Sequence, residues 1–344
     1  MSLHHEILQQ PDAARRQLES TPDALDALAA RLRARPIASV VIAARGTSDH
    51  AAIYAQYVLG VRNGLSVGLA TPSLVSIYGA ELDVRDSLVI GISQSGASPD
   101  IVAVVTAAAR QGAPTLAITN DPSSALAAAA EHVIDLAAGP ELAIAATKTY
   151  TTSLLAIARL SLALRPDPEA ERAMRDIPGA ITAAIDLEPA VAAVVAELGP
   201  IDRCVIVGRG FEYATAREWA LKLKELARVF ADPYSAADFL HGPIALVQPG
   251  IPALVLAPSG ATEASMAELL GDLRGRSVDS VVLSDVAATL DRGRWPIALP
   301  GGVAEWLRPV VSIVPGQLFA YHLTRARGLD PDAPRYLSKV TRTN

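Results

Sequence analysis

Short apolar runs rich in β-branched residues alternate with segments of helical spacing along most of this chain. The first run spans residues 37–43, stops at an Arg-Gly-Thr-Ser turn, and is followed by helical spacing over residues 49–59. Further runs of this kind predict strands at residues 66–70, 87–92, 114–119, 132–136, 204–207, 253–257, 280–283 and 296–299. Strands that alternate with helices are typical of parallel sheets covered by helices on both faces, so the pattern predicts an α/β fold.

The same strand, glycine turn and helix occur twice, at residues 40–46 (VVIAARG) and 204–210 (CVIVGRG). This repetition predicts two copies of one α/β unit. Near the N-terminus we expect one helix that stops near Pro11 or is distorted there, and a second from Thr21-Pro22 to Arg35. The predicted organisation is N-terminal helices in 1–36, a first domain in 37–165, linker helices in 166–200, a second domain in 201–330 and a tail in 331–344.

Composition narrows the function classes. The 344 residues are 51% hydrophobic with a net charge of −6, and basic residues form only short clusters, so nucleic-acid binding is not expected. The N-terminus lacks the apolar core of a signal peptide and no window reaches about 18 apolar residues, which predicts a cytoplasmic protein without a membrane span. The single cysteine, Cys204, lies in an apolar run and is interpreted as a core residue. The six histidines lack metal-ligand spacing, so no metal and no other cofactor is predicted.

A Ser/Gly loop follows the predicted strand at residues 87–92 and opens a helix. Its polar residues are Ser93, Gln94, Ser95 and Ser98, and Gly96 would let the backbone approach a ligand closely. Hydroxyl groups and backbone N–H groups at a helix N-terminus favour a phosphate dianion. An ordinary turn with a serine helix cap explains the same residues equally well. A second polar turn, Gly46-Thr47-Ser48, ends another predicted strand, and in an open parallel sheet both turns would meet at one edge.

Charged residues also recur at helical spacing in the second half. Glu218, Lys222 and Glu225 stand at i, i+4 and i+7, which places two carboxylates and an ammonium on one stripe of a helix predicted over 212–227. Such a stripe is often only a solvated helix face, and His241, in a turn, is equally weak evidence alone. The chain has four lysines among its 30 basic residues, and lysine, unlike arginine, can lose a proton or form an imine.

One of these rare lysines, Lys148, is expected to have a specific role in the structure. Lys148 stands at the start of a long predicted helix, where its charge opposes the helix dipole, so we expect it to have a specific partner, with Glu141 as a structural candidate.

Seven segments together resemble the sugar isomerase (SIS) family, and within it the isomerase half of glucosamine-6-phosphate synthase and the SIS-type amino-sugar-phosphate deaminases. The matching segments are EILQQP at 6–11, RGTS at 45–48, ISQSGASPD at 92–100, AATKTY at 145–150, EWALKLKE at 218–225, HGPIAL at 241–246 and LSK at 337–339. They keep the family's order over almost the whole chain.

The resemblance implies two SIS domains, a homodimer and an amino-sugar 6-phosphate as the ligand. It implies that Glu225 moves a proton between sugar carbons 1 and 2, and that His241 opens the sugar ring in the neighbouring subunit's site. It further implies that Lys339 contacts the sugar carbonyl or forms an imine, with Lys222 and Glu218 supporting the site near the amino group. The residues expected to contact the sugar or its phosphate are Gly46, Thr47, Ser48, Ser93, Gln94, Ser95, Ser98 and Ala146.

Departures from the family pattern affect the expected reaction. Leu240 and Ala146 stand where the synthase has lysine and serine, and the SIS pattern begins almost at once, so we expect no use of glutamine-derived ammonia. Conversion of glucosamine 6-phosphate to fructose 6-phosphate and ammonia is the leading hypothesis. Dehydration of N-acetylglucosamine 6-phosphate and a non-catalytic sugar-phosphate sensor are the alternatives.

Overall fold

The computed structural model of the chain describes residues 2–20 and 23–339, and the predicted helix start at Thr21-Pro22 lies outside these residues. The chain forms two compact units. The unit called here the N-unit comprises 12–141, 148–175 and the chain from Ser338 on. The C-unit comprises the chain up to Pro11, 142–147 and 176–337. Each unit is therefore completed by segments from distant parts of the sequence.

The N-unit contains a five-stranded, wholly parallel sheet in the order β2-β1-β3-β4-β5. Its strands are β1 (Ser39–Ala43), β2 (Ser66–Leu69), β3 (Ser87–Ile92), β4 (Thr115–Thr119) and β5 (His132–Asp135). Every residue of the two neighbouring strands β3 and β4 is buried, as expected for strands covered on both faces.

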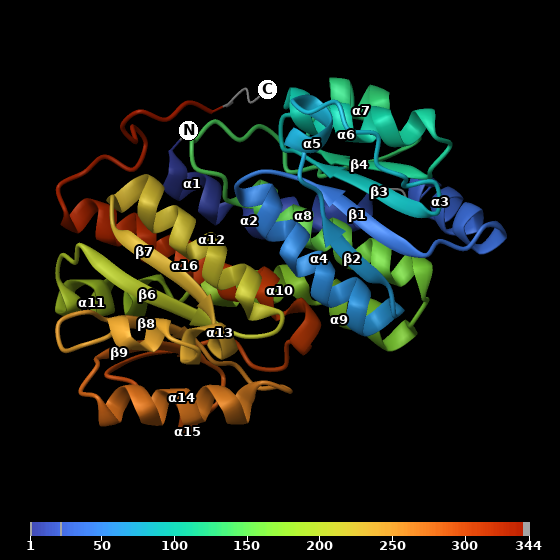
Figure 1. Cartoon of the computed structure of the whole chain (residues 1–344). Helices are drawn as coiled ribbons and strands as arrows, with labels where there is room; N and C mark the ends of the chain where they lie inside the picture. The colour runs from blue at the N-terminus through green and yellow to red at the C-terminus, as the bar shows by residue number, and fades with distance from the viewer. Residues whose placement is uncertain (1, 21–22, 340–344) are drawn as a thin grey trace. The chain divides into compact units, whose positions relative to one another are not determined.

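Helices cover both faces of this sheet (Figure 1). The helices of the N-unit are α2 (Gln10–Glu19), α3 (Asp23–Ala34), α4 (Thr47–Asn63), α5 (Ser73–Ser76), α6 (Pro99–Arg110), α7 (Ala125–Ala129), α8 (Lys148–Leu164) and α9 (Pro168–Arg175). On one face, α6 and α7 bury an apolar cluster against β1, β3 and β4. On the other face, α4 packs against the strands and α8, whose residues are buried almost throughout.

The C-unit contains a second five-stranded parallel sheet in the order β10-β9-β8-β6-β7. Its strands are β6 (Arg203–Gly208), β7 (Phe230–Ser235), β8 (Ala253–Leu256), β9 (Ser280–Ser284) and β10 (Trp295–Ala298). The sequence analysis did not predict β7, whose sequence FADPYS lacks an apolar run and contains Pro233. A proline is tolerated there because β7 is an edge strand, which leaves one side of its backbone unpaired.

The C-unit helices also form a layer on each face of their sheet (Figure 1). They are α1 (Leu3–Leu8), α10 (Ile177–Ile185), α11 (Glu188–Leu198), α12 (Glu212–Lys222), the π turn η1 (Leu223–Ala227), α13 (Ala236–Leu240), the 3-10 turn η2 (Pro243–Leu246), α14 (Glu263–Gly275), α15 (Ala287–Leu290), the 3-10 turn η3 (Glu305–Leu307) and α16 (Arg308–Ala326). α12 packs between the sheet and α16, where Gly316 lies against the ring of Trp219, while α14 covers the opposite face.

The predicted α/β fold with two parallel sheets is confirmed, and every predicted strand is present. The helix break expected near Pro11 is present, since α1 ends at Leu8 and α2 begins at Gln10, which places this proline in the first turn of α2, where no intrahelical N–H is needed. One local detail was not predicted. The helix predicted over 212–227 is α-helical only to Lys222 and continues as the π turn η1.

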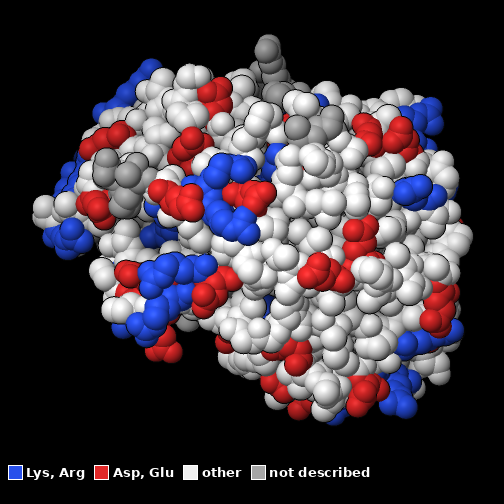
Figure 2. All heavy atoms as spheres, turned by 180° about the vertical axis from the view of Figure 1, so that it is seen from behind, with Lys and Arg blue, Asp and Glu red and all other residues white. Residues whose placement is uncertain are grey.

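The burial of Cys204 and the distribution of surface charge agree with what the amino-acid composition predicted. Cys204 is buried, and burial raises the pKa of its thiol to about 12, which confirms that it is a core residue. On the face seen in Figure 2, acidic and basic side chains are interspersed. Within 2–20 and 23–339 no single helix is long and apolar enough to cross a membrane, although the bent pair Pro168–Ile185 and Glu188–Leu198 meets the length and composition criteria together.

Glu212, at the start of α12, is a buried acid whose ionisation opposes folding. Its Oε1 lies 2.7 Å from Ser312 Oγ, and that hydroxyl also lies 3.0 Å from the carbonyl oxygen of Arg308. Burial raises the pKa of Glu212 above the usual glutamate value, although the hydrogen bond to Ser312 and the charge of Arg308 act the other way. Because the pKa of Glu212 is higher in the folded state than in the unfolded state, the protonated side chain contributes fully to stability below the unfolded-state pKa. That contribution is lost as the pH rises through the folded-state pKa.

We therefore expect Glu212→Gln to leave the free energy of unfolding nearly unchanged at about pH 4 and to raise it by about 1 kcal/mol at about pH 8. Urea denaturation at both pH values measures this change. Glu268→Gln, on the exposed side of α14, serves as the control and should show no such pH dependence. A loss of stability in Glu212→Gln that grows with pH would contradict the interpretation.

Candidate active site

The two serine-containing turns meet at the carboxyl edge of the N-unit sheet. β1 and β3 are paired parallel neighbours, so the turn with Ser48 and the loop with Ser93 leave the sheet side by side. Arg45 joins them, because its guanidinium lies 2.9 Å from Asp100 at the start of α6. α4 and α6 both begin at this edge, so the N–H groups of two helix N-termini point toward it.

Several polar side chains at this edge have no hydrogen-bond partner among the described residues. Ser98 occupies the N-cap position of α6, but its side chain makes no capping hydrogen bond. Within the part of the chain that the structure describes, the side chains of Ser48 and Gln94 likewise form no hydrogen bond. In contrast, Ser93 Oγ and Ser95 Oγ accept from the backbone N–H groups of Gly96 and Ala97. Unused donors beside two helix N-termini favour the phosphate interpretation over a serine cap.

Gly96 is required by the geometry of this loop. Its φ is +60°, and a Cβ there would lie 2.0 Å from Ser124 Oγ. Gly112 has a similar φ of +73°, but a Cβ there would meet no atom within 4 Å. Comparing the two positions therefore separates backbone strain from steric overlap.

We expect Gly112→Ala to lower the free energy of unfolding by about 1–2 kcal/mol, the cost of a left-handed alanine. Gly96→Ala should cost about 1–3 kcal/mol more, because Ser124 and the loop must shift. Urea denaturation of both variants measures the difference. Equal losses would show that Ser124 does not restrict this loop.

In the C-unit, Glu218, Lys222 and Glu225 form a buried ion cluster. Lys222 Nζ lies 3.4 Å from a Glu218 oxygen and donates to Glu225 Oε2 at 2.6 Å. The side chains of Glu218 and Lys222 are 0% and 1% exposed, whereas that of Glu225 is 23% exposed. The predicted stripe is present, but its burial shows that it is not a solvated helix face.

The cluster leaves one carboxylate oxygen available for chemistry. Within the described chain nothing donates to Glu225 Oε1, while Oε2 is held by Lys222. Burial by itself would lower the pKa of Lys222, but the charges of Glu218 and Glu225 raise it above the usual lysine value. Lys222 is therefore an ammonium at neutral pH. Glu225 lies in the π turn η1, and π turns occur frequently at functional sites.

His241 lies in an exposed turn of the C-unit, between α13 and η2. Its backbone N–H donates to the carbonyl of Asp238, and Gly242 follows with a φ of +137°. The preceding residue, Leu240, is also exposed. The side chain of His241 is thus accessible from outside the unit.

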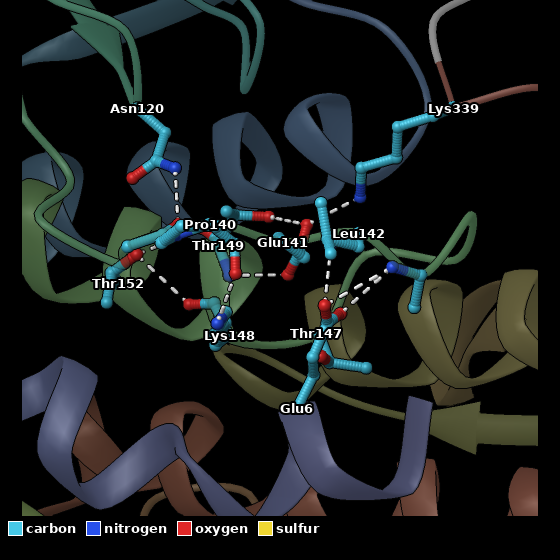
Figure 3. A network of polar contacts seen from close by, with 12 residues as sticks. Glu6, Asn120, Pro140, Glu141, Leu142, Thr147, Lys148, Thr149, Thr152 and Lys339 are labelled. Atoms are coloured by element: carbon cyan, nitrogen blue, oxygen red, sulfur yellow. Dashed lines mark hydrogen bonds and ion pairs between the residues drawn. The ribbon is translucent and has the colours of Figure 1, made fainter. Parts of the chain in front are cut away.

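Lys339 forms a salt bridge within the N-unit (Figure 3). Lys339 Nζ lies 2.9 Å from Glu141 Oε2. Glu141 is buried, and it also accepts hydrogen bonds from the backbone N–H and the hydroxyl of Thr149 at the start of α8. Lys148, also buried, donates to the carbonyl of Pro140 at 2.6 Å, so this lysine has a specific partner, but that partner is a backbone carbonyl next to the expected candidate Glu141.

The N-terminal motif at 6–11 has a structural role in the C-unit. The buried carboxylate of Glu6 accepts from the backbone N–H groups of Leu142 and Ala143. Gln10 Nε2 donates to Gln317 Oε1 at 2.8 Å. The hydrogen bonds of Glu6 hold the segment 142–147, which contains the half-buried Ala146.

The structure thus assembles the predicted residues in two groups. The N-unit carries Gly46, Thr47, Ser48, Ser93, Gln94, Ser95, Ser98 and Lys339, and the C-unit carries Ala146, Glu218, Lys222, Glu225 and His241. The sequence analysis did not predict the pairing of Glu141 with Lys339, because no local pattern links residues 198 positions apart. Within the described ranges, no three His, Cys, Asp or Glu side chains are arranged to hold a metal ion.

Comparison with known proteins identifies the family. Residues 35–163 and 197–324 each match the SIS domain, so the chain belongs to the SIS domain family. The resemblance seen in the sequence motifs is therefore confirmed at the level of the family.

The chain is also similar to individual members. It is 34% identical to glutamine–fructose-6-phosphate aminotransferase (isomerizing) of Halobacterium salinarum, over 97% of this chain and 58% of that protein. It thus spans little more than half the length of this relative. A solved structure from Silicibacter pomeroyi, of a protein proposed to be a phosphosugar isomerase, is 34% identical with a TM-score of 0.87, covering 96% of this chain and all of that one. The C-terminal domain of glucosamine-fructose-6-phosphate aminotransferase from Francisella tularensis is 26% identical with a TM-score of 0.86, covering 96% of each chain.

Proposed function

We propose that this protein enolises an amino-sugar 6-phosphate, with Glu225 as the residue that moves the proton between carbons 1 and 2. The observation that carries this proposal is the paired geometry of Glu225, whose Oε2 is held by the buried Lys222 while Oε1 makes no hydrogen bond in the described chain. A general base needs an oriented carboxylate with one free oxygen. Similarity to the isomerizing aminotransferases supports the same substrate class.

The proposed outcome is deamination of glucosamine 6-phosphate. After ring opening, Glu225 removes the proton from carbon 2 and returns it to carbon 1, which leaves an imine at carbon 2. Water hydrolyses that imine to fructose 6-phosphate and ammonia. Lys222 remains an ammonium throughout, so it stabilises negative charge near the reacting carbons rather than acting as a base.

In this proposal the N-unit edge binds the 6-phosphate through Ser48, Gln94, Ser98 and the N–H groups of α4 and α6. Their unused hydrogen-bonding groups support this role. Lys339 takes part at the sugar carbonyl, where its ammonium would exchange Glu141 for the ligand.

The test is a direct assay with two substrates. The purified protein is incubated separately with glucosamine 6-phosphate and with N-acetylglucosamine 6-phosphate, and ammonia and sugar products are followed by mass spectrometry. Ammonia with fructose 6-phosphate from the free amine is the expected result. Loss of one water from the acetylated sugar would replace deamination by elimination, and tight binding without any product would favour the sugar-phosphate sensor.

We also propose that the protein acts as a homodimer in which His241 serves the neighbouring subunit's site. The exposure of His241 supports this arrangement. In an equal mixture of Glu225→Gln and His241→Asn chains, a heterodimer then keeps one intact site. Reassociated mixtures should therefore recover about a quarter of wild-type activity, whereas each variant alone stays low. Absence of recovery, with subunit exchange verified, would place His241 in its own subunit's site.

A further inference from the structure

A cavity of about 360 Å³ in the C-unit borders the predicted base. Its wall is formed by the η1 turn and by the segment that precedes Lys339, and its lining residues are Lys224, Glu225, Arg228, Arg335, Tyr336 and Leu337. Arg228 and Tyr336 have φ angles of +55° and +64°. Only two other non-glycine residues in the described chain have a positive φ, so backbone strain is concentrated at this cavity.

The cavity has an excess of positive charge. Within residues 2–20 and 23–339, no carboxylate lies within the 4.0 Å ion-pair distance of Lys224, Arg228 or Arg335. Elsewhere in the C-unit, Arg294, Arg308 and Arg327 each pair with an aspartate.

The one carboxylate in the wall does not offset this excess. Glu225 is already paired with Lys222 at 2.6 Å. Three uncompensated cations around one hollow, in a protein of net charge −6, attract an anion.

We propose that this cavity receives a carboxylate carried by a substituent on the amino nitrogen of the sugar phosphate. This inference rests on the proposed function, which places the sugar carbons 1 and 2 at Glu225, and a substituent on the nitrogen beside them extends into the cavity that Glu225 lines. Arginine binds a carboxylate through two parallel N–H bonds, and Arg228 and Arg335 supply two such groups.

The remaining wall fits the carbon part of such a substituent. Leu337 offers an apolar surface, and the ring of Tyr336 lies under the Arg335 guanidinium with 4.4 Å between the guanidinium carbon and the ring centroid. Amino-sugar phosphates with an anionic nitrogen substituent are therefore expected to bind more tightly than those with an uncharged substituent.

The test compares two ligands that differ only in charge, N-carboxymethyl- and N-carbamoylmethyl-glucosamine 6-phosphate. Isothermal titration calorimetry on the full chain should give at least about tenfold tighter binding of the carboxylate, and the preference should shrink as salt is raised. In the double variant Arg228→Gln/Arg335→Gln the two affinities should agree within about twofold, with the amide bound as in wild type. Arg276→Gln, an exposed arginine at the end of α14, is the control and should keep the full preference.

Equal affinity for the two ligands in wild type, or a preference that survives in the double variant, would overturn the inference. If the double variant fails to fold, as judged by its melting temperature, the salt dependence of the wild-type preference decides the question. The same preparations are assayed for turnover of glucosamine 6-phosphate. Turnover without a charge preference contradicts the cavity alone, and a charge preference without turnover contradicts the enzymatic proposal alone.

Discussion

Replacing Glu225 by glutamine is expected to lower the turnover of an amino-sugar 6-phosphate by about 10²–10⁴-fold, the usual contribution of a general base. The amide has nearly the same size, but it cannot take a proton from carbon 2. Lys222 keeps Glu218 as a partner, so the helix and its ion cluster should remain folded. Steady-state kinetics on the variant, with ligand affinity measured separately by calorimetry, gives the change in kcat apart from binding.

Glu268→Gln provides the matched control for this change. Glu268 is an exposed glutamate in the same unit, on α14. It should retain wild-type kcat and KM. If Glu225→Gln keeps full turnover, another group moves the proton and the proposed role is wrong. If it loses binding instead of kcat, Glu225 holds the ligand rather than reacting with it.

Replacing Lys222 by methionine is expected to lower the free energy of unfolding by about 3–5 kcal/mol, the cost of breaking a buried ion pair from one side. Glu218 is 0% exposed and would lose the ammonium that lies 3.4 Å away. Urea denaturation followed by circular dichroism measures the loss. Lys224→Met, on an exposed side chain in the same segment, is the control and should change stability by no more than about 0.5 kcal/mol.

A double variant shows whether the stability is lost through the broken ion pair or through the lost packing of the lysine stem. Glu218→Gln together with Lys222→Met removes both buried charges, so most of the stability lost in Lys222→Met should return. If the double variant is as unstable as Lys222→Met, lost packing of the lysine stem, and not the loss of the ammonium beside the Glu218 carboxylate, causes the effect. Loss of activity is expected in both variants, because Lys222 orients Glu225.

Local sequence patterns predicted most of the secondary structure because the inner strands of both sheets are largely buried on both faces. β3 and β8, for example, read as continuous apolar runs, which any α/β core requires. The edge strand β7 was missed because an edge position relaxes that requirement and tolerates Pro233. The π turn at Leu223–Ala227 was missed because its residues have the same apolar spacing as an α-helix of similar length.

The candidate site likewise has features that the sequence could predict and features that it could not. Residues close in sequence, such as Glu218, Lys222 and Glu225, could be placed on one stripe from helical geometry alone. Their burial could not, because it depends on how α12 packs against α16 and the sheet. Lys148 was expected to have a partner, but the carbonyl of Pro140 is a backbone group that no side-chain pattern identifies.

By itself the sequence determined the α/β class, the repeated unit, the resemblance to the SIS family and the candidate phosphate-binding and acid/base residues, since each of these follows from residue types and their spacing. Only the tertiary structure decided that Lys222 is buried between two carboxylates, that the tail Lys339 pairs with Glu141, and that three cations surround a cavity beside Glu225. The physical reason is that burial and long-range pairing depend on which surfaces meet when the chain folds. Spacing along the chain specifies the surfaces of single helices and strands, and their packing decides which charges lose water and which gain a partner.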